Sequence, residues 1–306
     1  MIATAQEHAA APQARTAGGT RKFDFWALRV LPGMVPIMLL VGVFLLWPVV
    51  GICTGSLARG GGLAALVNYR ASFAPQYLNS WLLTAAVSFS SAALGAIIGF
   101  CGAWSLQALG RPRLTLATVA LASIGANFSG LPLALAFMVA LSPGGFVTGW
   151  LLGALHISLS AMRFSLANPS GLVLVYAFFQ APLMLVLIYP TLEGIGRRDW
   201  LPAAQSLGAN GPQAFWRVTL PVILPGLLGS SLLLVANAFG AYVTAYAIAG
   251  GTVNLLPIQL GYLINGNVEL EPALADAIAL EMLLALSVLL IVYQVLMLRA
   301  RRRAAT

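Results

Sequence analysis

The stretch from Trp81 to Leu109 contains no charged side chain, and it constrains the fold more than any other feature. A helix rises 1.5 Å per residue, so about 20 residues are enough to cross a bilayer core roughly 30 Å thick. The stretch therefore predicts a transmembrane helix, and further apolar runs of similar length predict several more.

The composition agrees with a polytopic membrane protein. Of the 306 residues 60% are hydrophobic and 8% charged, whereas a soluble domain carries about a quarter charged residues. We expect an all-α fold with six transmembrane helices over 23–300, between a disordered tail at 1–22 and a basic tail at 301–306. The expected helices cover about 30–53, 81–109, 114–141, 171–192, 221–248 and 277–298. The apolar stretch 146–169 is interrupted by Arg163 and Asn168-Pro169, and is expected to be an interfacial or loop helix.

The basic residues set the expected orientation. If the N-terminus lies in the cytoplasm, only three of the 16 lysines and arginines, namely Arg59, Arg70 and Arg163, fall in outer segments. Cytoplasmic loops of membrane proteins are enriched in these residues, so both termini are predicted to be cytoplasmic. The placement of basic residues between apolar runs also argues against a nucleic-acid partner, despite the net charge of +8.

The sequence offers no group of residues that would hold a metal or a nucleotide. Cys53 and Cys101 lie in apolar runs as small hydrophobic residues, and the two histidines, His8 and His156, are far apart in the sequence. The single lysine, Lys22, is not part of the Gly-x-x-x-x-Gly-Lys-Ser/Thr loop that cradles phosphates. We expect no cofactor and no enzymatic activity, with any ATP hydrolysis carried out by a partner chain.

The segment 199–221 lies between the fourth and fifth expected helices, on the cytoplasmic side. Asp199 and Pro202 suit the first turn of a short helix, and the break at Asn210-Gly-Pro212 starts a second one that carries Phe215-Trp216. One face of the first short helix is made of the small or apolar residues Ala203, Ala204, Leu207 and Gly208. Leu220-Pro221 is expected to open the fifth membrane helix. Local physics leaves two interpretations open, an ordinary helix at the membrane surface and a docking site.

The spacing within this segment resembles the signature of the inner-membrane permease subunits of bacterial ABC importers. That signature reads Glu-Ala-Ala, three residues, Gly, nine residues, Ile-x-Leu-Pro. Here Ala203-Ala204, Gly208 and Val218-Thr-Leu-Pro221 stand in the same register. Pro202 replaces the glutamate, and Asp199, three residues upstream, is a candidate substitute for the missing carboxylate.

The resemblance implies a coupling helix that docks onto a separate ATPase subunit, whose closure switches the permease between inward- and outward-open states. The residues expected to take part in docking are Asp199, Pro202, Ala203, Ala204, Leu207, Gly208, Phe215, Arg217, Leu220 and Pro221. The resemblance also implies a bacterial inner-membrane location, a periplasmic binding protein, and a second permease subunit. A heterodimer is favoured and a homodimer stays open.

Polar side chains within the apolar runs are candidates for a substrate pathway, because polar groups inside a membrane need partners or a water-filled path. The candidates are Asn127, Asn237, Tyr242, Thr244 and Glu281. Other roles remain open for them. The asparagines can bond to neighbouring helices, the set from Tyr242 to Tyr246 can form an interfacial belt, and Glu281 can reach the outer interface.

The run from Phe239 to Gly251, with Asn254-Leu-Leu-Pro257 and Ile264-Asn-Gly-Asn267, is similar to the permeases of polyamine, aminophosphonate and ferric-iron importers. The outer loop near 250–275 and its end carry Glu269, Glu271 and Asp276 and no basic residue. The expected cargo is therefore a small polar or cationic solute.

Two other functions compete with this prediction. A stand-alone secondary transporter or channel usually shows internal repeats and buried coupling charges, whereas only Glu281 lies within an expected span here. A membrane enzyme would need His, carboxylate or Ser/Lys groups that converge at one depth. The sequence therefore favours the translocating subunit of an ABC importer.

Overall fold

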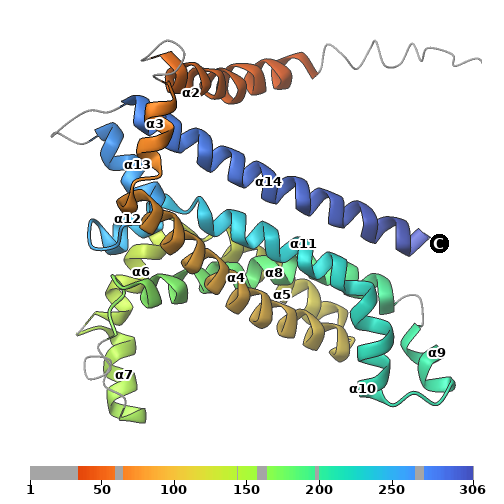
Figure 1. Ribbon diagram of the computed structural model, residues 1–306. Helices are drawn as coiled ribbons and strands as arrows, with labels where there is room; N and C mark the ends of the chain where they lie inside the picture. The colour runs from red at the N-terminus through yellow and green to blue at the C-terminus, as the bar shows by residue number, and fades with distance from the viewer. Residues whose placement is uncertain are drawn as a thin grey trace, which may run out of the picture. The chain divides into compact units, whose positions relative to one another are not determined.

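The computed structural model describes residues 34–58, 65–142, 144–156, 164–196, 200–265 and 272–305 (Figure 1). Every regular element within these ranges is a helix. The chain divides into two compact units, Met1–Gly51 and Ile52–Thr306. The tail expected at 1–22 lies outside the described residues, as do Asp199, Glu269 and Glu271.

The described part of the first unit is helical from Met34 onward. It contains the π-helical segment η1 (Gly42–Leu46) and the first residues of α2 (Trp47–Ala58). No residue of η1 is buried, although all of its larger side chains are apolar. A helix that is apolar on every side is typical of a membrane span.

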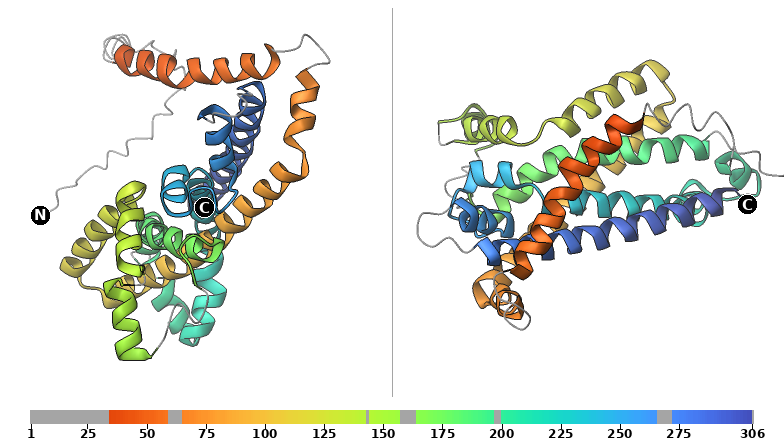
Figure 2. Two further views of the ribbon diagram at one scale, coloured as in Figure 1. Left: turned by 90° about the vertical axis from the view of Figure 1, so that its left-hand side faces the viewer. Right: turned by 90° about the horizontal axis from the view of Figure 1, so that it is seen from above.

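The second unit is a bundle of long helices with shorter helices at both ends (Figures 1 and 2). The long helices are α4 (Pro75–Leu109), α8 (Pro169–Gly196), α11 (Leu220–Phe239) and α14 (Pro272–Ala305). The shorter ones are α3 (Ala65–Ser72), α5 (Pro112–Asn127), α6 (Leu131–Leu141), α7 (Phe146–Leu155), α9 (Trp200–Ser206), α10 (Gly211–Ala214), η3 (Phe215–Thr219), α12 (Tyr242–Ala249) and α13 (Leu256–Asn265). Helices α4, α8 and α11 pack against one another, and α14 packs along α11.

Six helices in the described ranges are long and apolar enough to cross a membrane. They cover 34–57, 75–109, 131–155, 169–194, 211–239 and 272–299. The predicted all-α fold with six membrane helices is confirmed. Four of the spans are found where they were expected, with ends that differ by a few residues.

The third span was predicted wrongly. The helix expected over 114–141 is divided into α5 and α6. The span covers 131–155 and so includes α7, which the prediction made an interfacial or loop helix. Gly130 adopts φ 76° and ψ −144°, a conformation that only glycine enters readily. Pro132 follows in the first turn of α6, where it has no N–H to continue a helix from the preceding turn.

The limits of the fifth span were also predicted wrongly. The helix expected over 221–248 ends at Phe239, because Gly240 and Ala241 leave the helical conformation before α12 begins. In the other direction, helical structure continues from α11 back through η3 and α10, so the span covers 211–239. The fifth span therefore shares residues 211–221 with the predicted docking segment 199–221.

Small residues let α4 and α8 approach each other closely. Gly95 and Gly99 lie one turn apart, and a Cβ added at Gly95 would lie 2.6 Å from the Cβ of Gln180. A Cβ added at Gly99 would overlap the carbonyl oxygen of Ala181. Close backbone approach through small residues is how membrane helices gain packing where lipid is as apolar as their side chains. Within the same contact, the fully buried Gln180 donates a hydrogen bond to Ser91 Oγ over 3.1 Å.

Candidate functional site

Two interrupted helices meet in the second unit. The interruption between α5 and α6 contains Gly130, and the interruption between α11 and α12 contains Ala241. The Gly130 amide donates to Thr244 Oγ1 over 2.9 Å, and the Tyr176 hydroxyl donates to the Ala241 carbonyl over 2.8 Å. Inside a membrane an unpaired backbone group is costly, so irregular backbone is tolerated where protein groups pair it. Here each interruption has such a partner.

The two interruptions share one local geometry. Phe128 (φ −82°, ψ 82°) and Ala241 (φ −78°, ψ 63°) are both close to the centre of an inverse γ-turn. Ser129 N accordingly donates to Asn127 O over 3.0 Å, and Tyr242 N donates to Gly240 O over 2.8 Å. This turn interrupts the helical hydrogen-bonding pattern within a single residue, and so leaves backbone groups outside that pattern in both helices.

A polar pocket of about 240 Å³ lies at this meeting point. Its lining consists of Ser129, Gly130, Phe179, Asn237, Gly240, Ala241, Tyr242, Val243 and Thr244. None of these residues is charged, so the pocket offers hydroxyl, amide and backbone groups. Three predicted pathway residues, Asn237, Tyr242 and Thr244, are brought together here. Thr244 is buried and bonded to the facing interruption, which excludes it from an interfacial belt.

The other two predicted pathway residues lie elsewhere. The Asn127 amide donates to Ser123 O over 2.7 Å, within its own helix. Glu281 Oε1 accepts a hydrogen bond from the buried Ser72 Oγ over 2.6 Å and so joins α14 to α3. Neither residue lines the polar pocket.

The structure adds residues that the sequence did not single out. Tyr176 and Phe179 are almost fully buried on α8, where one pairs the Ala241 carbonyl and the other forms a wall of the pocket. Both stand in an apolar run among other aromatic and aliphatic residues. No local pattern distinguishes them from ordinary core positions.

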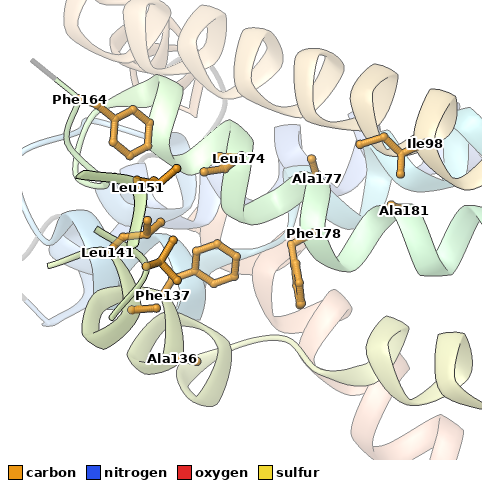
Figure 3. A pocket seen from close by; sticks show the side chains of 12 residues that line it. Ile98, Ala136, Phe137, Leu141, Leu151, Phe164, Leu174, Ala177, Phe178 and Ala181 are labelled. Carbon is orange, nitrogen blue, oxygen red and sulfur yellow. The ribbon is translucent and has the colours of Figure 1, made fainter. Parts of the chain in front are cut away.

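A larger cavity, of about 850 Å³, is unsuited to polar cargo (Figure 3). It lies between α4, α6, α7 and α8. Its described lining is apolar throughout: Ile98, Ala136, Phe137, Ala140, Leu141, Val147, Leu151, Phe164, Leu174, Ala177, Phe178 and Ala181. A polar solute that enters such a cavity loses its hydrogen bonds to water without replacement. The polar pocket is therefore the better candidate for a pathway.

The predicted docking segment folds as two short helices joined by a tight turn. Helix α9 ends in a pair of bonds in which Gly208 N donates to Gln205 O and Ala209 N donates to Ala204 O. This is the Schellman arrangement, and Gly208 takes the left-handed conformation it needs, with φ 85°. Pro212 lies in the first turn of the next helix, as predicted, and Asn210 N is capped by Gln213 Oε1 at 3.2 Å.

The segment presents apolar side chains to its surroundings. Leu207 is 90% exposed and Trp216 66% exposed, and large exposed apolar groups that adjoin polar ones mark interaction surfaces. The predicted docking residues Ala203, Gly208, Arg217 and Pro221 are also exposed. Ala204 is buried, whereas Phe215 and Leu220 are half-buried. Phe215 packs edge to face on Trp104 of α4 at 5.0 Å between ring centres.

Helix α11 has the segment at its start and α12 after its end (Figure 1). The polar pocket is lined by residues at this second end. Interrupted helices around a polar pocket, together with an exposed surface outside the bundle, define a multi-pass membrane transport subunit. Residues 128–305 match the family of binding-protein-dependent transport system inner membrane components, and the chain belongs to this family. The predicted ABC importer permease is thereby confirmed, as is its inner-membrane location.

The names of the related permeases mention different transported solutes. The sulfate transport system permease protein CysW of Synechocystis is 29% identical over 211 residues, which cover 68% of this chain and 73% of CysW. The spermidine/putrescine permease protein PotB of Haemophilus influenzae is 32% identical over 137 residues, 44% of this chain and 46% of PotB. The molybdenum permease protein ModB of Mycobacterium tuberculosis is 32% identical over 116 residues, 36% of this chain and 42% of ModB.

A solved structure shares the fold. A chain of a bacterial ABC transporter that imports the acidic polysaccharide alginate superposes with a TM-score of 0.66. The match covers 90% of this chain and 96% of the other, at 17% sequence identity.

Proposed function

We propose that this chain forms one half of the transmembrane pathway of its importer, with both termini in the cytoplasm, and docks through the 199–221 segment onto a separate ATPase. One observation carries the proposal: a continuous helix joins the exposed segment to the polar pocket. The 20 residues of α11 span about 30 Å, which is the thickness of a bilayer core. A displacement of the docking segment therefore reaches the far side of the membrane.

Exposure in the segment supports a docking surface centred on Ala203, Leu207 and Gly208. Leu207 projects from the end of α9, and a Cβ built on Gly208 meets no atom within 4 Å. A partner surface can therefore come close to the backbone at this turn. Asp199, as the substitute for the missing glutamate, is part of the same proposal.

The pocket supports a second permease as the other half of the pathway. Ser129, Asn237 and Gly240 are exposed on its walls, although the sequence around them is strongly apolar. A facing subunit would complete the walls. We propose a different permease rather than a second copy, in line with the resemblance to polyamine-type importers, and a periplasmic binding protein that delivers the cargo.

For the cargo we propose a small polar solute, with two chemical classes in competition. A cationic solute (polyamine-like, aminophosphonate or ferric iron) is favoured by the carboxylates Asp276 and Glu281 on α14, and spermidine and putrescine appear in the name of PotB. A tetrahedral oxyanion is favoured by the pocket, since α6 and α12 both begin at it and helix N-termini attract anions. Sulfate and molybdenum appear in the names of CysW and ModB.

The experiment that tests the function uses the full chain together with its ATPase, second permease and binding protein. We expect co-purification with the ATPase and ATP-dependent uptake in proteoliposomes. Uptake by this chain alone, without an ATPase, would instead establish a stand-alone transporter. Thermal-shift screening of the binding protein against spermidine, aminoethylphosphonate, ferric complexes, sulfate and molybdate decides between the two cargo classes.

A further inference from the structure

Both π-helical segments in the described part of the chain stand at the same distance before a proline. Segment η1 is followed by Trp47-Pro48, and segment η3 by Leu220-Pro221. In each, the residue before the proline donates its backbone N–H five residues back, from Trp47 to Gly42 O and from Leu220 to Phe215 O. The repetition indicates a common physical cause.

Proline favours such a bulge but does not impose one, because Pro182, Pro190 and Pro225 lie inside α8 and α11 without a π-helical residue. Pro221 has no N–H, and its ring would clash with the carbonyl of the residue four positions earlier, Arg217, in a regular α-helix. A π-turn widens the helix by one inserted residue and so moves that carbonyl away from the ring. Pro225 lies one turn further along the same helix, where no π-helical residue is found in α11.

The bulge changes how the docking segment is aligned with α11. One inserted residue corresponds to a rotation of about 100° and a rise of 1.5 Å. In the bulged register Ala214 is fully buried and Phe215 packs on Trp104, whereas Trp216 remains exposed. The bulge therefore selects the face of α10 and η3 that meets α4.

Thr219 is the residue whose hydrogen bonding would change if the helix were regular and had no bulge. Its side chain is 2% exposed, and its Oγ1 finds no hydrogen-bond partner among the described residues. In a regular helix the hydroxyl of a threonine can bond to the carbonyl four residues earlier, here that of Phe215. In the bulge the Phe215 carbonyl accepts from the Leu220 N–H, and Thr219 Oγ1 does not bond to it. Closing the bulge would thus satisfy Thr219 at the expense of a clash at Pro221.

The structure leaves room beside the bulge for such a change. A groove of about 460 Å³ separates α4 from the start of α10 and η3. It is lined by Phe100, Cys101, Trp104, Ser105, Gly211, Pro212, Phe215 and Trp216. Movement of α10 toward α4 would reduce the volume of this groove.

We infer that Pro221 and Thr219 are positioning residues of opposite effect: Pro221 holds the docking segment one residue out of helical register with α11, and Thr219 favours closure of the bulge. Through this change of register, movement of the docked ATPase is transmitted to α11. This inference rests on the proposed function, because it assigns a role within coupling rather than in docking or cargo binding.

The decisive comparison is Pro221→Ala against the matched control Pro225→Ala, in the complete transporter reconstituted in liposomes. We expect Pro221→Ala to lower the cargo imported per ATP hydrolysed about tenfold, and Pro225→Ala to stay within about twofold of wild type. Equal effects of the two substitutions would overturn the inference. Loss of ATPase binding in Pro221→Ala would also overturn it, because Pro221 would then be a docking contact.

Thr219 is tested with variants that separate its hydroxyl from its shape. Thr219→Val keeps the branched shape, and we expect slower uptake at unchanged ATPase binding, whereas Thr219→Ser restores uptake because it keeps the hydroxyl. If Ser fails to restore uptake, packing rather than hydrogen bonding explains the residue.

The register itself is measured by cross-linking. Cys101 lines the groove opposite Gly211, so the pair Cys101 and Gly211→Cys, in a Cys53→Ala background, reports the separation of α4 and α10. We expect its cross-linking yield to change between nucleotide-free and ATP-bound transporter, and this change to be lost in Pro221→Ala. If the transporter imports cargo but the cross-linking yield is the same with and without nucleotide, the inferred change of register is refuted. The proposed function is then left intact. A wild-type chain that binds no ATPase refutes the proposed function instead.

Discussion

Thr244 and Gly130 are 114 residues apart in the chain, yet the Gly130 amide donates to the Thr244 hydroxyl over 2.9 Å. The same hydroxyl lies 3.4 Å from the Gly130 carbonyl oxygen. One side chain on α12 thus pairs the backbone at the interruption between α5 and α6. This pairing satisfies backbone groups of an interrupted helix in an apolar environment, at the edge of the polar pocket.

Replacement of Thr244 by valine is expected to destabilise the protein. Valine keeps the shape but removes the acceptor, and a buried donor without a partner costs about 1–3 kcal/mol. Thermal unfolding in detergent should show a lower Tm for Thr244→Val, with Thr244→Ser close to wild type. An unchanged Tm for the valine variant would mean that water pairs the Gly130 amide.

The close contact between α4 and α8 predicts that alanine substitutions at Gly99 and at Gly149 differ in their effect on stability. Gly99→Ala places its methyl group against the Ala181 carbonyl, and overpacking of this kind costs about 1–3 kcal/mol. Gly149 on α7 has no atom within 4 Å of a built Cβ, so Gly149→Ala should leave stability unchanged or slightly higher. The two Tm values, measured side by side, test whether backbone approach at Gly99 is as close as the structure shows.

Features coded by neighbouring residues were predictable from the sequence. Pro212 starts the next helix as predicted, because it acts through its own backbone conformation. Gly208, predicted to lie on the face of the first short helix, instead follows the end of α9 at Ser206 in a left-handed conformation. The interruption at Gly130 had a signal as well, a glycine followed by Leu131-Pro132, but the surrounding apolar residues favoured one continuous span. A span is predicted from length and from hydropathy averaged over many residues. A single glycine with a positive φ hardly changes that average.

Features that depend on distant residues were not predictable. Tyr176 reaches the Ala241 carbonyl across 65 residues of chain, and nothing near Tyr176 in the sequence indicates this partner. Asn127 and Asn237 look alike in the sequence as polar residues within apolar runs. Tertiary structure separates them, since the first bonds within its own helix and the second lines the pocket.

Leu207 provides a test of docking that is separate from stability. Its side chain is 90% exposed, so Leu207→Asp removes no core packing and should leave the Tm unchanged. A buried charge without a partner weakens an interface, and we expect at least about a tenfold loss of affinity for the ATPase. Exposed Val67→Asp on α3, outside the six spans and away from the segment, is the control for general effects of an added charge. Equal ATPase binding by Leu207→Asp and wild type would move the docking surface elsewhere.

Asn237 tests the polar pocket as part of the pathway. Its exposed amide lines the pocket from α11, so Asn237→Ala removes hydrogen-bonding capacity without leaving a buried group unpaired. We expect uptake to fall about tenfold or more at unchanged ATPase binding, because one lost hydrogen bond to a polar cargo in transit weakens its passage by about 1.5 kcal/mol. Ser231→Ala is the matched control on the same helix, since the Ser231 hydroxyl bonds to Leu227 O within α11. Uptake rates over a series of cargo concentrations separate a change in apparent affinity from a change in maximal rate. If Asn237→Ala and Ser231→Ala import at the same rate, the cargo passes without contacting this pocket.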